Sequence, residues 1–259
     1  MRPMINFPLL ITCCLVFALF SAGCLTGPGS NGTPPAPVTG MTTTISSDGK
    51  EYPAYMTVPS TAGKHPGIVL LHSFNGLEQG YMDMMDQMAM DGFVVIAPEW
   101  QTYGQRAGDP EVEGVLRSSV AALQTRPEVD SSKIGLTGFC AGGRYTMLFL
   151  PQVTELKAGV AFYGFPYSRG YTNNTTPAEH IEELEDPLLM IHGSDDRASP
   201  IDGIYNYTKE LDAFGKYYEL KVYQGKPHGF MIANGSLATD DIAEDAYYQM
   251  IRFFRRNLA

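Results

Sequence analysis

The stretch Lys133-Ile-Gly-Leu-Thr-Gly138-Phe-Cys140-Ala-Gly142-Gly143 decides the fold of this chain. Its first half is typical of a buried strand, and we expect a helix to begin at about Ala141. A nucleophile on so sharp a strand-to-helix turn needs small residues two positions before and after it, and Gly138 and Gly142 meet that need. The pattern therefore predicts a nucleophile elbow with Cys140 at its apex.

The surroundings of Cys140 favour a reactive thiol over a small buried hydrophobic residue. A helix that begins behind the sulfur points its amides at it, which favours the thiolate, and the amide of Ala141 can donate to a developing oxyanion. The other three cysteines, Cys13, Cys14 and Cys24, belong to the N-terminal segment, so Cys140 has no disulfide partner in the folded part.

Apolar runs and helix-period segments alternate from Met41 onward, which predicts one α/β domain over residues 41–259. We expect a mainly parallel sheet with helices on both faces. The expected strands are Thr42–Ile45 and Ala54–Val58, in a polar hairpin region, and then Gly67–His72, Phe93–Ala97, Lys133–Thr137, Ala158–Tyr163, Leu188–His192 and Tyr218–Tyr223. Helical spacing recurs at Tyr81, Met84, Met85 and Met88, and in the last helix at Ala243, Tyr247, Met250 and Phe254.

An elbow of this kind works with an acid and a histidine that follow it in that order. In Gly193-Ser-Asp-Asp196-Arg-Ala-Ser-Pro200 an acid follows a strand, and the spacing from glycine to proline favours Asp196 over Asp195. His228, in Gly225-Lys-Pro-His228-Gly-Phe230, lies between the last strand and the last helix. We interpret His228 as the base and Asp196 as its partner.

A second oxyanion amide is expected just after the strand that ends at His72, in Ser73-Phe74-Asn75-Gly76. His72 either supports this turn or contacts substrate, and Ser73 is a further candidate for a substrate contact.

Charge and residue spacing exclude some partners. The net charge of -10 opposes binding to nucleic acid. No cluster of His, Cys, Asp or Glu has metal-ligand spacing.

The first 24 residues read as a secretory signal: Arg2 leads into an apolar run over 7–20, and Ser21-Ala-Gly-Cys24 follows. This end resembles the lipobox of prokaryotic lipoproteins, which implies lipidation of Cys24, although Ser21 stands where leucine is usual. An uncleaved anchor helix and plain secretion stay open. We expect an exported protein tethered to the outer face of the cell membrane, with residues 25–40 as a flexible linker rich in Gly, Pro and Thr.

Four segments together resemble the dienelactone hydrolase family of α/β-hydrolases: Gly138-Phe-Cys140-Ala-Gly142-Gly143, Phe162-Tyr163-Gly164, Gly193-Ser-Asp-Asp196 and His228-Gly-Phe230. The resemblance runs from about Glu51 to the C-terminus. It implies an α/β-hydrolase fold, a catalytic triad of Cys140, Asp196 and His228, an oxyanion hole from the amides of Phe74 and Ala141, and no cofactor or metal.

Two departures from the family pattern bear on the substrate. Ser73 stands where the family has a glutamate beside the first oxyanion amide, and Met231-Ile-Ala233 follows the histidine motif where the family has a carboxylate-binding arginine. In the connection after Trp100 the only basic group is Arg106, a possible substrate contact. We therefore expect cleavage of a small, neutral carboxylic ester or lactone. An acyltransferase or thioesterase of the same fold and a non-catalytic, lipid-tethered surface binding protein are the alternatives.

Overall fold

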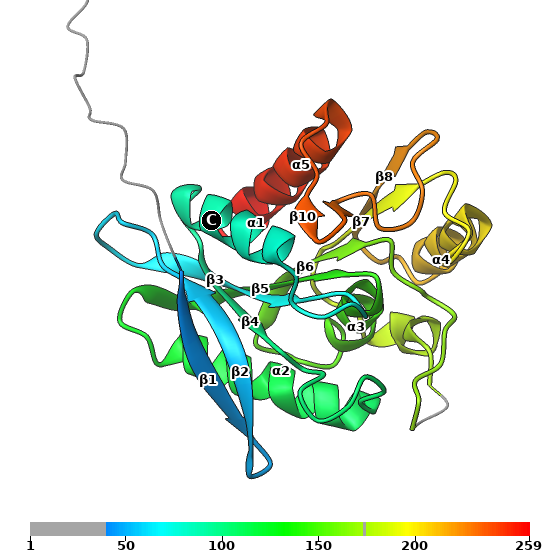
Figure 1. Ribbon diagram of the computed structural model, residues 1–259. Coiled ribbons are helices and arrows are strands. Elements are labelled where there is room, and N and C mark those ends of the chain that lie inside the picture. The colour runs from blue at the N-terminus through cyan, green and yellow to red at the C-terminus, as the bar shows by residue number, and fades with distance from the viewer. Residues whose placement is uncertain (1–39, 173–174) are drawn as a thin grey trace, which may run out of the picture. The chain divides into compact units, whose positions relative to one another are not determined.

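A computed structural model describes residues 40–172 and 175–259, which are built around one eight-stranded sheet (Figure 1). The strand order is β1-β2-β4-β3-β5-β6-β7-β8; the pairs β1/β2 and β2/β4 are antiparallel and all other neighbours are parallel. The strands are β1 (Met41–Ser47), β2 (Lys50–Thr57), β3 (His65–Leu71), β4 (Val94–Pro98), β5 (Val129–Phe139), β6 (Leu156–Phe162), β7 (Leu188–Gly193) and β8 (Tyr218–Tyr223).

Helices cover both faces of this sheet (Figure 1). The helices α1 (Gln79–Met90) and α5 (Asp241–Asn257) share one apolar core with one side of the strands. The other core contains α2 (Asp109–Gln124), α3 (Ala141–Phe149) and α4 (Ile201–Ala213). A 3-10 helix, η1 (Pro177–Glu183), and a small hairpin, β9 (Ile232–Ala233) with β10 (Ser236–Leu237), complete the elements. The predicted α/β architecture is confirmed.

The expected strands all form, with differences at their ends. The largest is in β5, which begins four residues earlier than expected because Val129 already pairs with His65 of β3. The hairpin β9/β10 was not predicted, since two-residue strands are too short to show a period. The methionine stripe of α1 faces the core: Met84, Met85 and Met88 are fully buried.

The crossing of β5, α3 and β3 is the tightest backbone approach that bears on the elbow. A β-carbon on Gly142 would lie 1.9 Å from the carbonyl oxygen of Leu71, and one on Gly138 would lie 2.1 Å from that of Gly142. Between them Cys140 adopts φ 57° and ψ -113°, a region that side-chain-bearing residues rarely occupy. The glycines therefore allow α3 to start directly behind Cys140.

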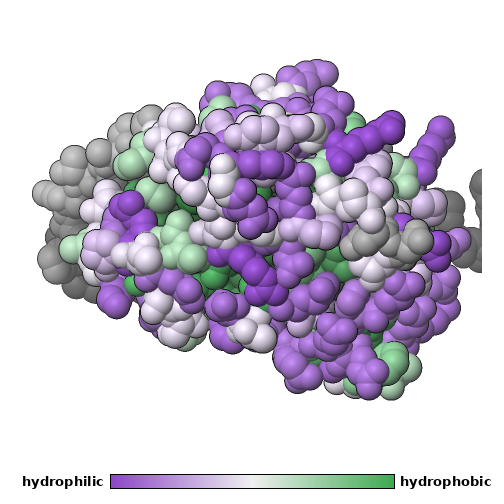
Figure 2. Space-filling model, turned by 90° about the horizontal axis from the view of Figure 1, so that it is seen from below, coloured by the Kyte–Doolittle hydropathy of each residue, from purple (hydrophilic) through white to green (hydrophobic). Residues whose placement is uncertain are grey.

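The surface seen from below is mostly hydrophilic, and hydrophobic side chains show mainly in recesses between polar ones (Figure 2). Within the described residues, no helix has the length and apolar character needed to cross a bilayer. The predicted signal, lipidation of Cys24 and linker up to Thr39 lie outside the described residues. Gly40, the first described residue, is held by its amide, which donates to the Tyr55 hydroxyl and to Asp86.

Replacing Gly142 tests this backbone crossing. We expect Gly142→Ala to lower the free energy of unfolding by more than about 3 kcal/mol, because the new methyl group meets backbone that cannot move aside. Gly203→Ala is the matched control: this glycine lies in α4, its β-carbon would be 3.9 Å from the nearest neighbour, and we expect a gain of up to about 1 kcal/mol. Urea unfolding of both variants measures the difference, and equal stabilities would contradict the crossing described here.

Candidate active site

Cys140 lies at the end of β5, where the chain turns sharply into α3. Its amide donates to the carbonyl oxygen of Phe162 on the neighbouring strand β6, at 3.1 Å, which anchors the apex of the turn. The cysteine is half-buried and free. It lines two separate cavities, so its thiol can be reached from outside.

Two loops bring an acid and a histidine together near Cys140. Asp196 follows β7 and His228 follows β8, and Nδ1 of His228 donates to Oδ2 of Asp196 at 2.8 Å. The other oxygen of Asp196 accepts the amides of Ala198 and Ser199 at 2.9 and 2.8 Å. Asp195, the rival candidate, is exposed and bonds only to its neighbour Ser194 among the described side chains.

Charge is well compensated in this pair. Burial raises the pKa of Asp196, but the hydrogen bonds from His228 and the Ser199 amide outweigh burial and leave the pKa below its usual value. Burial lowers the pKa of His228, but the hydrogen bond to Asp196 and the nearby Cys140 outweigh burial and raise the pKa to about 9. A carboxylate can only accept, so Nδ1 of His228 carries a proton. Nε2 of His228 has no hydrogen-bond partner among the described residues, and the side chain lines the same cavity as Cys140.

A second histidine and two aromatic rings hold this pair in place. His192 is buried; its Nε2 donates to the carbonyl oxygen of Ser199 at 2.7 Å and lies 3.3 Å from Oδ2 of Asp196. The rings of Tyr163 and Phe165 pack against the His228 imidazole, with centroids 4.9 and 5.3 Å away. The imidazole therefore has little freedom to rotate away from Asp196.

The turn after β3 presents the amide of Phe74. Hydrogen bonds from the amides of Gly76 and Asn75 to the backbone and side-chain oxygens of Ser73, each at 3.2 Å, fix the turn. Within the described residues, the amides of Phe74 and Ala141 donate no hydrogen bond, and both residues line a cavity next to Cys140. Both amides are thus free to bind an oxygen.

Two of the predicted substrate contacts, His72 and Arg106, do not line a cavity at Cys140. His72 is fully buried: it stacks on Trp100 with centroids 5.0 Å apart, and its Nδ1 donates to the Ser73 carbonyl. Burial lowers its pKa to about 4, so the ring is neutral and supports the turn rather than contacting substrate. Arg106 does not line either cavity at Cys140; it lies over the ring of Tyr171 at 5.7 Å. Ser73, by contrast, does line a cavity.

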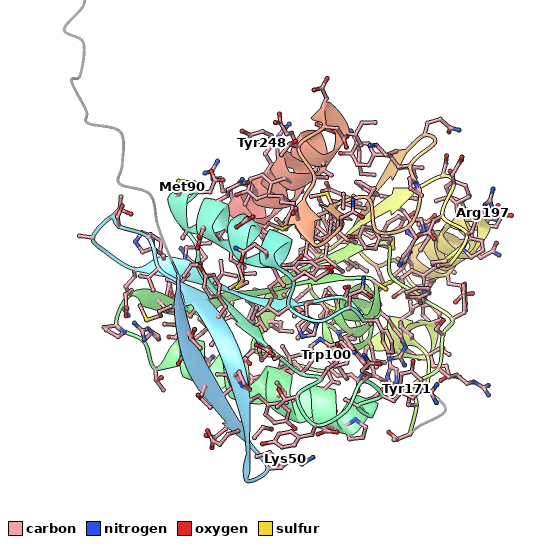
Figure 3. The ribbon with its side chains drawn as sticks, in the orientation of Figure 1. Lys50, Met90, Trp100, Tyr171, Arg197 and Tyr248 are labelled. Carbon is pink, nitrogen blue, oxygen red and sulfur yellow. The ribbon has the colours of Figure 1, made fainter. Side chains whose placement is uncertain are left out.

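The space at Cys140 is divided into two chambers that share Cys140 and Phe74. The aromatic chamber has a volume of about 340 Å³. Its rings are those of Phe74, Trp100, Tyr145, Phe165 and Tyr171. Trp100 and Tyr171 lie near each other, close to α3 (Figure 3).

The polar chamber is smaller, about 190 Å³. It contains the His228 side of the site. Its polar side chains are Ser73, Asn75, Glu78, Tyr81 and Tyr163, in addition to His228.

Sequence reasoning missed two arginines in the wall of the aromatic chamber. Arg144, on α3, forms a buried two-pronged ion pair with Asp109, at 2.8 Å for both contacts. Arg169, in the segment after β6, is exposed at the rim. Neither arginine lies in the connections after Trp100 and His228, where the sequence analysis looked for basic groups. The charge of Arg144 is neutralised by Asp109.

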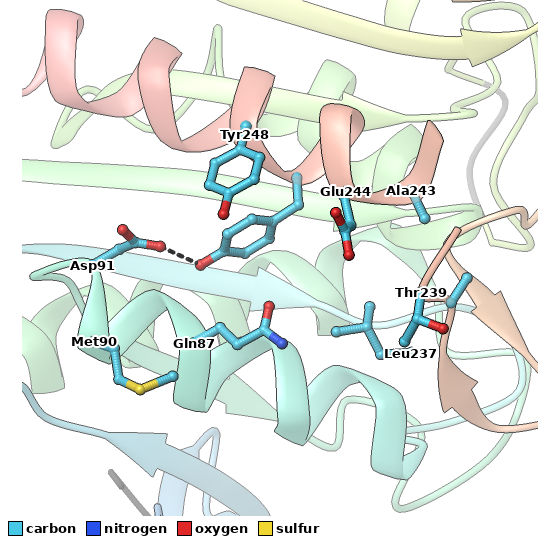
Figure 4. A pocket seen from close by; sticks show the side chains of 10 residues that line it. Gln87, Met90, Asp91, Leu237, Thr239, Ala243, Glu244 and Tyr248 are labelled. Atoms are coloured by element: carbon cyan, nitrogen blue, oxygen red, sulfur yellow. Dashed lines mark hydrogen bonds between the residues drawn. The ribbon is translucent and has the colours of Figure 1, made fainter. Parts of the chain in front are cut away.

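A further cavity of about 390 Å³ lies between α1 and α5, away from Cys140 (Figure 4). Tyr247 donates to Asp91 there at 2.7 Å. Gln87, Met90 and Glu244 also line it, but no described lining residue is a nucleophile paired with a base. Within the described residues, no group of His, Cys, Asp and Glu could hold a metal ion.

The His228–Asp196 pair predicts a pH-dependent contribution to stability. The pKa of His228 is raised from 6.5 to about 9, so the stabilisation is fully present below pH 6.5 and is lost as the pH rises through 9. A shift of this size corresponds to at most about 3 kcal/mol, and partial solvent exposure of the ring reduces it. We expect the difference in unfolding free energy between wild type and His228→Asn to shrink between pH 6.5 and 9. Urea unfolding across this range measures it, and a difference that grows with pH would contradict the pairing.

Comparison with known proteins places the chain in a family. Residues 52–258 match the Dienelactone hydrolase family. A Salmonella typhimurium protein named "Putative carboxymethylenebutenolidase" is 26% identical over 243 residues, covering 86% of this chain and 89% of the relative. The protein usf of Aquifex pyrophilus is 27% identical, covering 82% of this chain and 96% of that protein.

Among solved structures, a Klebsiella pneumoniae protein described as a "Putative Dienelactone Hydrolase" superposes with a TM-score of 0.78 at 24% identity, covering 85% of this chain and 99% of the other. This likeness supports the same fold. The match over residues 52–258 shows that the chain belongs to the dienelactone hydrolase family.

Proposed function

We propose that this chain hydrolyses a small carboxylic ester or lactone through a covalent thioester on Cys140. The observation that carries the proposal is the 2.8 Å hydrogen bond from Nδ1 of His228 to Asp196, which leaves Nε2 without a hydrogen-bond partner in a side chain that lines the same cavity as Cys140. Names given to relatives, such as carboxymethylenebutenolidase, support lactones and esters as the substrate class.

In the proposed mechanism His228 holds the proton of the Cys140 thiol, because its raised pKa keeps the imidazole protonated at neutral pH, and the thiolate attacks the ester carbonyl carbon. The amides of Phe74 and Ala141 bind the oxyanion. When the carbon–oxygen bond breaks, His228 gives the proton to the oxygen of the leaving alcohol. His228 then acts as the base for a water molecule, which attacks the thioester and releases the acid. General base and oxyanion contributions are of the order of 10² to 10⁴-fold and 10² to 10³-fold.

The family has a glutamate at the position of Ser73, but the site still contains a base, His228. Ser73 holds the turn after β3 through its hydroxyl, so His228, which Asp196 orients, activates the thiol. Export and tethering through Cys24 stay predictions, because these residues lie outside the described part of the chain.

Hydrolysis of p-nitrophenyl acetate and of small lactones tests the assignment of Cys140. We expect Cys140→Ala to reduce the rate to that of the buffer, because the acyl-enzyme can no longer form. A Cys140→Ala protein that unfolds like wild type and keeps full activity would refute the proposal. Release of acyl products to added alcohols or thiols in preference to water would instead identify an acyltransferase.

Alkylation of Cys140 separates an active site from a binding protein that has lost turnover. At pH 7 we expect iodoacetamide to label Cys140 stoichiometrically, and at least ten times more slowly in His228→Asn, because the base that stabilises the thiolate is gone. Mass spectrometry follows the modification. Equal rates in the two proteins would show that His228 does not act on the thiol.

A further inference from the structure

The two chambers at Cys140 differ in the chemistry of their walls. The aromatic chamber contains five rings, while the polar chamber contains a carboxylate, an amide and hydroxyl groups. Because both meet at Cys140 and Phe74, an ester carbonyl held at the sulfur extends one substituent into each.

We infer that the acyl part of the substrate occupies the aromatic chamber and the alcohol part occupies the polar chamber. The preferred substrate is then an ester of an aromatic acid with a small alcohol that carries a second hydroxyl group. This inference rests on the proposed function and names its substrate class.

The position of His228 sets the direction. A general acid must reach the oxygen of the leaving alcohol, so that oxygen departs toward Nε2 of His228. His228 lines the polar chamber and does not line the aromatic chamber. As the thiolate forms the carbon–sulfur bond and the carbon–oxygen bond breaks, the proton passes from His228 to the alcohol in the polar chamber. The acyl group stays on the sulfur, with its chain on the opposite side.

The polar chamber fits a small alcohol with a hydroxyl group. Glu78 is half-buried, and within the described residues its carboxylate forms no hydrogen bond or ion pair, so it is free to accept from a ligand. The hydroxyl of Tyr163 is buried and has no hydrogen-bond partner among the described residues. An alcohol hydroxyl satisfies such groups, whereas an apolar substituent would leave them unpaired.

The aromatic chamber fits a planar apolar acyl group. Trp100 and Tyr145 pack edge to face with centroids 5.3 Å apart, and both are buried, so the inner wall is preformed. Asp109 neutralises the charge of Arg144, and Arg169 is exposed to solvent at the rim, so neither brings an unscreened charge to the buried inner wall. Burial of a phenyl group against such rings favours binding.

Two isomeric esters test the direction. Methyl phenylacetate and benzyl acetate contain the same atoms but exchange the phenyl group between the acyl and alcohol parts. We expect kcat/KM for methyl phenylacetate to be at least ten times higher, after each value is divided by the rate of hydroxide-catalysed hydrolysis of that ester. Equal values, or a preference for benzyl acetate, would overturn the inference.

A second pair tests the polar chamber. We expect 2-hydroxyethyl phenylacetate to be cleaved at least five times faster than propyl phenylacetate, which has the same chain length. In Glu78→Leu this ratio should fall to about one, whereas Glu244→Leu, an acidic residue of the α1–α5 cavity, should keep the wild-type ratio. A wild-type ratio of one, or an unchanged ratio in Glu78→Leu, would overturn the assignment of this chamber.

Activity toward p-nitrophenyl acetate distinguishes failure of this inference from failure of the proposed function. If wild type cleaves p-nitrophenyl acetate and Cys140→Ala does not, but neither ester pair shows the expected preference, the inference alone fails. If wild type cleaves no ester at all, the proposed function fails and the inference fails with it.

Discussion

The close backbone approach of Leu71, Gly138 and Gly142 is the constraint on which the rest of the site depends. Neither glycine has room for a β-carbon. Because glycine has none, β5 can turn directly into α3, and Cys140 lies at the apex of the turn with a positive φ. The same crossing places the amide of Ala141 and the end of β3 close to Cys140, so the proposed oxyanion amides and the proposed nucleophile come from one junction. The strained backbone of Cys140 is kept in place because the tight packing around it allows no other conformation.

Around this junction the buried polar groups are almost all paired, which is what allows charge to be held in a low-dielectric site. Asp196 is compensated by His228 and two amides, and Arg144 by Asp109. Two buried groups that lack a hydrogen-bond partner, Nε2 of His228 and the hydroxyl of Tyr163, belong to residues that line the polar chamber, whereas Nε2 of His72, also unpaired, lies outside it. Unpaired buried groups are costly, so the two in the polar chamber favour a polar ligand there.

Members of one family can differ in substrate because the scaffold and the specificity residues lie on different elements. Here the strands of the sheet carry the fold, while much of the chamber walls comes from the turn after β3, the segment after β6 and the loop after β8, with further side chains from α1 and α3. Arg169 reaches the aromatic chamber from that second segment, a position that no comparison of motifs around Cys140 or His228 would identify.

The sequence by itself determined the α/β fold, the elbow at Cys140 and the segments that contain Asp196 and His228. These follow from local rules: strand and helix periods, glycines that a sharp turn requires, and the spacing of short motifs. Only the tertiary structure decided that His72 is buried against Trp100, that Asp195 is exposed, and that Glu78, Tyr163 and Arg169 line the chambers. These facts depend on packing between elements that are far apart in the chain. The residue pattern of one segment does not show which side chains of another segment it will contact.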